Sequence, residues 1–269
     1  MVTFPHCKIN LGLEVVSRRN DGYHNIETCF YPVPRTDILE VIPSPQFSFS
    51  QSGIAVPGNE KDNLCVKAFE LLQRDLKIGN AKIHLHKLIP MGAGLGGGSA
   101  DGAFTLSSLN HVFGLNISQE KLKDYASQLG SDCAFFIEDR PMFGTGRGEV
   151  LSPSSLSLKN KFLVLIKPEV HVSTADAYAG IQPQQIETSL SEILGLPVSE
   201  WKGKLINRFE DSIFKKHPVI AKVKDKLYSA GAMYASMSGS GASVYGIFEK
   251  SIDLRKEFSE MDYWSGVLK

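Results

Sequence analysis

The sequence predicts an α+β fold with two lobes and a ligand cleft between them. Segments with strand patterns precede segments with helical patterns, and this order occurs twice along the chain. Residues 152–157 are rich in serine and contain a proline, which makes them the best candidate for a junction. A chain of 269 residues with 42% hydrophobic side chains is long enough for two cores. We therefore expect an N-terminal domain over residues 1–153 and a C-terminal domain over residues 154–269.

The N-terminal lobe is expected to begin with strands. Apolar residues alternate loosely over 6–16, a polar turn follows at 18–24, and a second apolar run covers 27–33. This order predicts a hairpin or a meander. Further strand patterns occur at residues 38–42, 47–50 and 81–89.

Helical patterns accompany these strands. Residues 62–72 start with a capping residue and continue with helical spacing. Residues 118–129 form a second amphipathic pattern that ends at Gly130, a position where left-handed caps occur. Asp132 then precedes an apolar run over 133–137. In the C-terminal lobe we expect a strand, helices and two more strands at residues 162–166, about 175–230, 233–237 and 244–248.

The stretch from Pro90 to Asp101 holds five glycines in seven positions and leads into a helical pattern. Glycine tolerates positive φ and has no side chain to keep a ligand away, so this loop can turn backbone N–H groups toward one anion. Ser99 to Asp101 are expected to open the helix, whose first turn carries about half a positive charge. A strand, a glycine loop and a helix in this order predict a phosphate site. Its residues are Pro90, Met91, Gly92, Ala93, Gly94, Leu95, Gly96, Gly97, Gly98, Ser99 and Ala100.

Three familiar nucleotide motifs do not explain this loop. Gly92, Gly94 and Gly97 match the dinucleotide fingerprint, but the chain lacks a clear βαβ unit with an acidic residue about twenty positions on. A Walker A loop needs Lys and then Ser or Thr after its last glycine, whereas Ser99 follows Gly98 directly. The His-Arg-Asp and Asp-Phe-Gly triplets of protein kinases do not occur.

The overall charge argues against nucleic acid and anionic membranes as partners. Twenty-nine basic residues balance twenty-nine acidic ones, so any affinity for phosphate must be local. Residues 1–8 lack the cationic and apolar regions of a signal peptide, and no apolar run approaches membrane-spanning length. The expected location is therefore the cytoplasm.

No metal site and no disulfide framework are expected. The four cysteines form no C-x-x-C pair, which favours reduced thiols in the core. His84 and His86 could share one face of a strand, but no third ligand lies near them, so we interpret them as partly exposed strand residues. The cysteines are Cys7, Cys29, Cys65 and Cys133.

Four separated parts of the chain resemble the GHMP kinase superfamily. They contain, in order, K-I-N-L with D-G-Y-H, a phosphate loop, G-S-D-x-x-F-F and a last glycine-rich motif. The segments are Lys8–Leu13 with Arg19–His24, Gly94–Asp101, Leu129–Phe136 and Ser238–Ser243. One such match would be weak, but four in the right order over nearly the full chain are strong. The match is closest to the branch that acts in the non-mevalonate route to isoprenoid precursors.

The resemblance implies a two-lobed GHMP kinase fold with the active site in the cleft between the lobes. It implies ATP as the phosphoryl donor, with Mg²⁺ bound mainly through ATP and no metal ligand from the chain. The acceptor would be the tertiary 2-hydroxyl of a methylated four-carbon polyol that carries a cytidine diphosphate group. The protein would be a monomer or a weak homodimer.

The same resemblance assigns roles to residues. Asp132 would accept the proton of the acceptor hydroxyl, and Lys8 would lie beside it and offset charge on the transferring group. Asn10 would orient this pair, and Ser99 would lie near the phosphates. Each assignment has an alternative: a solvated strand residue for Lys8, a turn former for Asn10 and a helix N-cap for Asp132.

The cytidine group needs a flat apolar surface and hydrogen bonds at its edge. Tyr23, Phe30 and Tyr178 are candidates for stacking, and His24 is a candidate for the base edge or the diphosphate. Phe30 and Tyr178 also fit apolar strand and helix patterns and would then be core residues. Thr174 is a further candidate substrate contact, although N-capping of a helix explains it nearly as well.

The phosphate loop departs from its relatives at one place. Many relatives carry Ser-Ser-Asn-Ala where this chain has Ser99-Ala-Asp-Gly102. Asp101 adds a negative charge to the first turn of the helix, which suits the helix dipole but is potentially repulsive toward ATP.

Two other functions stay open. A GHMP kinase for another small alcohol, such as mevalonate, homoserine or a sugar, would differ at Tyr23 and His24. A non-catalytic nucleotide sensor would keep the phosphate loop and lose the chemistry. The presence of both Lys8 and Asp132 argues against the sensor.

Overall fold

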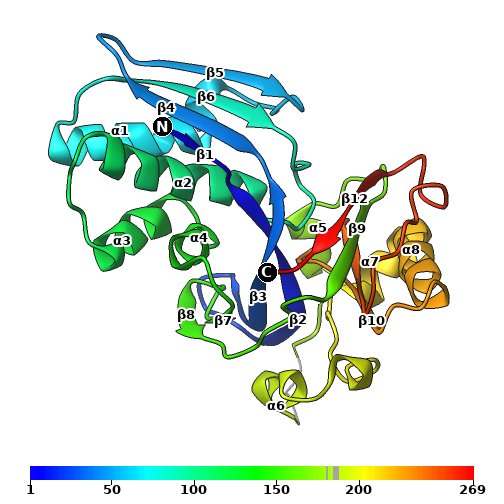
Figure 1. The fold of residues 1–269 in the computed structure, drawn as a ribbon. Helices are drawn as coiled ribbons and strands as arrows, with labels where there is room; N and C mark the ends of the chain where they lie inside the picture. Colours follow the sequence, from blue (N-terminus) through cyan, green and yellow to red (C-terminus); the bar gives the residue numbers. More distant parts are fainter. Residues whose placement is uncertain (180, 184–187) are drawn as a thin grey trace. The chain divides into compact units, whose positions relative to one another are not determined.

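The structure is a computed structural model that describes residues 1–179, 181–183 and 188–269. Two compact units are built from interleaved stretches of the chain. Unit 1 comprises Met1–Cys7, Arg35–Met91 and Gly96–Arg140, and unit 2 comprises Lys8–Pro34, Gly92–Leu95 and Pro141–Lys269. The predicted α+β class is confirmed, because each unit combines strands with helices (Figure 1).

Unit 1 contains a four-stranded sheet in the order β1-β4-β6-β5. Its strands are β1 (Val2–Thr3), β4 (Ile38–Pro43), β5 (Ser48–Gly53) and β6 (Ala81–Lys87). Neighbouring strands are antiparallel except for β5 and β6, which are parallel. Ala81, Ile83 and Leu85 are buried while the residues between them are not, as the alternation in the sequence predicts.

The helices of unit 1 pack on this sheet, and Figure 1 shows α1 and α2 along one of its faces. They are η1 (Glu60–Asp62), α1 (Leu64–Leu76), α2 (Gly97–Val112), α3 (Gln119–Leu129) and α4 (Cys133–Glu138). Phe69 of α1 and Leu106 of α2 share a buried cluster with Val41 and Ile83 of the sheet. Each such side chain contributes about 1.5–3 kcal/mol when fully buried, so this cluster fixes the helices on the sheet.

Side chains define where these helices start. Asn63 caps α1 by accepting the N–H of Cys65 at 2.9 Å, and Ser118 caps α3 by accepting the N–H of Lys121 at 3.3 Å. Gly130 ends α3, but its φ of 173° is extended, so the left-handed cap predicted there is wrong. Its carbonyl accepts the N–H of Cys133 at 3.1 Å, because Gly130 already belongs to the turn that starts α4.

Unit 2 contains two four-stranded sheets, in the orders β2-β3-β7-β8 and β10-β11-β9-β12. The strands are β2 (His6–Arg18), β3 (His24–Thr36), β7 (Met142–Thr145), β8 (Val150–Pro153), β9 (Phe162–Lys167), β10 (Tyr234–Met237), β11 (Val244–Phe248) and β12 (Asp262–Val267). The strand pairs of the second sheet, β10–β11, β11–β9 and β9–β12, are all antiparallel, and Tyr245 lies opposite both Leu165 and Ser236.

One core connects the two sheets of unit 2. It includes Leu13 of β2, Val164 of β9, Val244 of β11 and Val223 of α8. Leu13 also forms an isolated parallel bridge with Asn207. The helices of this unit are α5 (Thr174–Ala179), α6 (Leu190–Leu194), η2 (Val198–Glu200), α7 (Glu210–Lys216) and α8 (Pro218–Ser229). Over the described part of the chain, no helix is both long enough and apolar enough to cross a membrane.

Candidate active site

The glycine loop combines left-handed backbone with a helix start. Gly92, Gly94 and Gly96 have φ values of 60°, 74° and 69°, which side chains with a Cβ rarely adopt. Helix α2 starts at Gly97, two residues before the predicted start at Ser99. The N–H groups at the first positions of a helix have no intrahelical acceptor, so this end of α2 has the polarity that an anion requires.

Loop residues 92–95 belong to unit 2 and are fixed there by hydrogen bonds. The hydroxyl of Ser238 donates to the carbonyl of Gly94 at 2.8 Å, and the N–H of Ser243 donates to the carbonyl of Ala93 at 3.2 Å. The N–H of Lys8 donates to the carbonyl of Leu95 at 3.0 Å. Lys8, the first two residues of the phosphate-loop motif and the last glycine-rich motif are therefore joined in unit 2.

The close approach of Gly94 to the backbone of Ser238 leads to a stability prediction with a matched control. A Cβ at Gly94 would lie 2.0 Å from the carbonyl oxygen of Ser238, whereas a Cβ at Gly98 would meet nothing within 4 Å. Gly94→Ala should lower the free energy of unfolding by about 2 kcal/mol or more, through clash and positive φ. Gly98→Ala should leave it unchanged or raise it by up to about 1 kcal/mol. Equal denaturant midpoints for the two variants would contradict the close approach.

Lys8 and Asn10 form a buried polar chain on β2. The ammonium of Lys8 donates to Oδ1 of Asn10 at 2.6 Å, and Nδ2 of Asn10 donates to the hydroxyl of Thr28 at 2.9 Å. Lys8 and Asn10 are 4% and 2% exposed, so Lys8 is not a solvated strand residue and Asn10 is not a turn former. The Lys8 ammonium also lies 5.1 Å from the ring centre of Phe30. Phe30 is buried, which favours the core interpretation of this ring over cytidine stacking.

Asp132 lies in unit 1 at the N-cap position of α4, with helical φ and ψ of −85° and −11°. Its side chain makes no capping hydrogen bond, so the helix-cap alternative does not explain it. The next residue, Cys133, is hydrogen-bonded to the Ser99 side chain, and burial raises the pKa of its thiol to about 12. Asp132 therefore adjoins a residue that contacts the first turn of α2.

The cytidine candidates lie in unit 2. The rings of His24 and Tyr178 are stacked, with centres 4.9 Å apart and planes at 19°. Burial, reinforced by the charge of Arg18, lowers the pKa of His24, which favours the neutral ring. Tyr23 is 57% exposed and has the guanidinium of Arg147 5.0 Å above its ring. At the start of α5, the hydroxyl of Thr174 lies 3.5 Å from that of Ser240 in the last glycine-rich motif.

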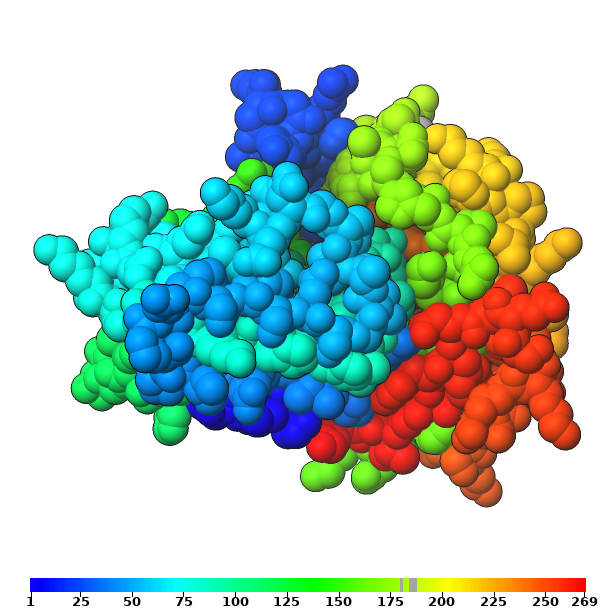
Figure 2. All heavy atoms as spheres, turned by 90° about the horizontal axis from the view of Figure 1, so that it is seen from above, coloured from blue at the N-terminus to red at the C-terminus, as the bar shows by residue number. Residues whose placement is uncertain are grey.

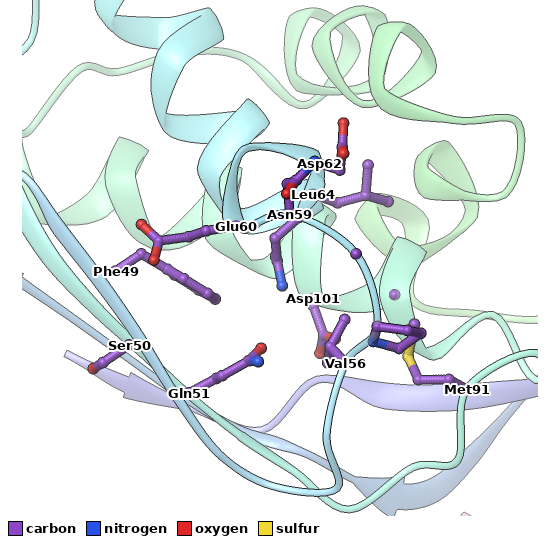
Figure 3. Close-up of a pocket in the computed structure, with 14 residues that line it drawn as sticks. Phe49, Ser50, Gln51, Val56, Asn59, Glu60, Asp62, Leu64, Met91 and Asp101 are labelled. Atoms are coloured by element: carbon purple, nitrogen blue, oxygen red, sulfur yellow. The ribbon is translucent and has the colours of Figure 1, made fainter.

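Unit 1 also holds a cavity of about 440 Å³ that no motif predicted. Its wall combines apolar side chains with amides and carboxyl groups, drawn in Figure 3. The lining residues are Phe49, Ser50, Gln51, Val56, Pro57, Gly58, Asn59, Glu60, Asp62, Asn63, Leu64, Met91, Gly98 and Asp101. Figure 2 shows the light-blue atoms of this part of the chain at the surface, with a hollow among them. Since Met91 and Gly98 belong to the glycine loop, the cavity adjoins the phosphate site.

His84 and His86 have hydrogen-bond partners within the sheet, and the cysteines are buried. His84 and His86 are hydrogen-bonded to Ser50 and Ser52 of the neighbouring strand. The four cysteines are buried thiols, as predicted. Within residues 1–179, 181–183 and 188–269, no group of three or more His, Cys, Asp or Glu residues could hold a metal ion.

Comparisons with known proteins agree with the motifs. Family models described as GHMP kinases N terminal domain and GHMP kinases C terminal match residues 63–140 and 197–263. The 4-diphosphocytidyl-2-C-methyl-D-erythritol kinase of Parabacteroides distasonis is 52% identical over the full length of both chains. That of Bacteroides thetaiotaomicron is 54% identical over 93% of this chain and 92% of its own.

A solved structure supports the same assignment. It is a crystal structure of 4-(cytidine 5'-diphospho)-2C-methyl-D-erythritol kinase, with a TM-score of 0.84 and 30% identity, covering 100% of this chain and 99% of its own. The fold, the joined motifs and these full-length relatives point to one conclusion. The chain belongs to the GHMP kinases and, among them, to the family of the 4-diphosphocytidyl-2-C-methyl-D-erythritol kinases.

Proposed function

We propose that this protein transfers the γ-phosphoryl group of ATP to the 2-hydroxyl of 4-diphosphocytidyl-2-C-methyl-D-erythritol and releases ADP. The reaction belongs to non-mevalonate isoprenoid precursor biosynthesis. The observation that carries the proposal is the hydrogen-bonded assembly of Lys8, loop residues 93–95 and the Ser238–Ser243 motif. The names of the full-length relatives supply the substrate.

ATP binds through its phosphates at the glycine loop. The N–H groups at the start of α2 and the left-handed glycines before it suit a polyanion. The cavity of unit 1 takes the nucleoside, because it reaches Gly98 and offers Phe49 and Val56 as apolar surface for a flat base (Figure 3). Mg²⁺ is bound mainly through ATP, and its charge offsets that of the phosphates.

Asp132 and Lys8 act on the same transferring group. As the acceptor oxygen bonds to the γ-phosphorus and the bond to ADP breaks, the hydroxyl becomes acidic and its proton passes to the Asp132 carboxylate. Lys8 offsets the negative charge of the transferring group. Asn10 holds the ammonium in place through the 2.6 Å hydrogen bond, so less reorganisation is needed during the reaction.

The cytidine group extends the stack of His24 and Tyr178. A neutral His24 can both donate and accept at the polar edge of a base, and Tyr23 offers a second exposed ring. Thr174 contacts the substrate beside Ser240. These contacts supply the selectivity that distinguishes this kinase from one for a smaller alcohol.

A substrate panel tests the proposal. ADP release with ATP and Mg²⁺ is measured with the cytidylyl alcohol, mevalonate and homoserine at equal concentrations. We expect turnover with the cytidylyl alcohol alone, and competitive inhibition by CDP against that substrate. Comparable kcat/KM for mevalonate or homoserine would contradict the substrate. Binding of ATP without ADP release for any alcohol would favour the nucleotide sensor.

Three further expectations stay predictions. They are the cytoplasmic location, the monomer or weak homodimer, and the domain boundary between residues 153 and 154. The two family models match one on each side of that boundary, but the two compact units do not divide there, because unit 2 also contains residues 8–34, 92–95 and 141–153.

A further inference from the structure

Three buried charged side chains meet at the start of α2. The ammonium of Lys87, at the end of β6, donates to Asp37 and, at 2.7 Å, to Oδ2 of Asp101. Lys87 is 1% exposed, Asp37 0% and Asp101 3%. One ammonium group therefore faces two carboxyl groups inside unit 1.

The carboxyl groups of Asp37 and Asp101 differ in the hydrogen bonds that their oxygens accept. Asp37 Oδ1 accepts the backbone N–H groups of Leu88 and Ile89 at 2.5 and 2.8 Å, so both of its oxygens have donors. Asp101 Oδ1 is buried and has no hydrogen-bond partner among the residues that the structure describes. A buried anionic oxygen without a donor is costly, whereas a proton on Asp101 can be shared in the hydrogen bond between the Asp101 and Asp37 side chains and leaves one carboxylate for one ammonium. The geometry thus favours a proton on Asp101.

The surrounding charges also favour a proton on Asp101. Burial, opposed by Lys87 and reinforced by Asp37, raises the pKa of Asp101 to about 8. Burial works against the charge on Lys87, but Asp101 and Asp37 outweigh it and raise the pKa of Lys87. The other titratable and charged groups facing the cluster or the adjoining cavity are Cys7, Arg35, Cys65, Glu60 and Asp62. Burial raises the pKa of both thiols, so they stay neutral near pH 8.

Asp101 lies close to the predicted phosphate site. It follows Gly97 by four residues, which is about 6 Å along a helix axis. It also lines the nucleotide cavity together with Gly98 and Met91 (Figure 3). A Cβ at Gly97 would lie 3.0 Å from the Lys87 ammonium, so this glycine lets the helix start approach the cluster. Over such a distance inside a protein, salt screens a charge only weakly.

We propose that Asp101 carries a proton when nucleotide occupies the glycine loop, and that the Asp37–Lys87–Asp101 cluster links ATP affinity to this proton. In this role Asp101 is a positioning residue, because it acts through the start of α2 and keeps it free of negative charge. The inference rests on the proposed function, since it requires a triphosphate at this loop. An ionised Asp101 would repel that triphosphate, and a neutral one would not.

The direction of the pH effect follows from this linkage. Bound triphosphate raises the pKa of Asp101 further. At a pH near the pKa of Asp101 in the free protein, binding therefore takes up part of a proton. The Kd for ATP should stay constant near pH 7 and rise about three- to tenfold by pH 9, since one proton allows at most tenfold per pH unit. Asp101→Asn keeps the shape of the side chain and removes the titration.

Isothermal titration calorimetry with MgATP, without the acceptor alcohol, measures this linkage. At pH 8, wild-type protein in two buffers of different ionisation enthalpy should show uptake of roughly half a proton on binding. Asp101→Asn should show almost no uptake and a Kd that varies less than twofold between pH 7 and pH 9. Asp101→Asn keeps all other titratable groups of the wild-type protein, so the difference in proton uptake between the two proteins reports on Asp101.

The outcomes separate the inference from the proposed function. Binding of MgATP without proton uptake by wild-type protein at pH 8 overturns the inference and leaves the kinase assignment intact. Equal uptake by wild type and Asp101→Asn also overturns it. Failure to bind MgATP at any pH overturns the proposed function and the inference with it. If Asp101→Asn does not fold, the absence of proton uptake by wild-type protein still overturns the inference.

Discussion

Replacing Asp132 by asparagine is expected to lower kcat by about 10³-fold while the Kd for ATP changes less than threefold. A positioned general base contributes about 10²- to 10⁴-fold, and asparagine cannot accept the hydroxyl proton. Asparagine keeps the shape of the side chain and removes no capping hydrogen bond, so helix α4 should stay intact. Loss of turnover with intact ATP binding would therefore report on chemistry.

The matched control for this variant lies at the other end of the same helix. Asp139 is the C-cap of α4, has a side chain that is 60% exposed and contacts His6 at 2.6 Å. Its φ of 51° is one that asparagine also adopts. Asp139→Asn should keep kcat within about twofold, since Asp139 is exposed and an asparagine can still form a hydrogen bond with His6. If Asp132→Asn keeps more than about a tenth of the wild-type kcat, Asp132 is not the base.

The fold was predictable where a hydrophobic period runs long enough to be recognised. Helix α3 has both a capping serine and helical spacing, and its range of Gln119–Leu129 differs by one residue from the predicted 118–129. Strand β12 has five half-buried residues followed by an exposed one, so the sequence gives no alternation to recognise. Strand β1 has two residues and α4 has six, which is too short for either period. Strands β1 and β12 have no counterpart among the predicted elements, and α4 was indicated only by the N-cap alternative for Asp132.

The candidate site was predictable only where neighbours along the chain carry the chemistry. Five glycines in seven positions indicated the phosphate loop by themselves. The cavity in unit 1 is lined by short runs at residues 49–51, 56–60 and 62–64 together with Met91, Gly98 and Asp101, and no local pattern connects these segments. Likewise, the sequence alone presents Asp101 as a charge facing ATP. Its partners are Asp37, between β3 and β4, and Lys87, at the end of β6, and their contact with Asp101 depends on tertiary packing.

Replacing Lys8 by methionine is expected to lower kcat at least about 100-fold, the cost of removing one preorganised donor to developing charge. Methionine fills a similar volume at this 4% exposed position. The stability effect has two opposing parts: Oδ1 of Asn10 loses its donor, at about 1–3 kcal/mol, while the desolvation of a buried ammonium is relieved. The thermal midpoint should therefore fall by only a few degrees, far less than the activity.

Lys159→Met removes the same charge from an exposed position and controls for the change in net charge. Steady-state kinetics should give this control a wild-type kcat, while Lys8→Met binds MgATP and turns over slowly. If Lys8→Met instead raises KM for ATP and keeps kcat, Lys8 contributes to ground-state binding and not to the transition state. The buried Lys8–Asn10–Thr28 chain would then be a structural support for loop residue Leu95, to which the Lys8 N–H donates.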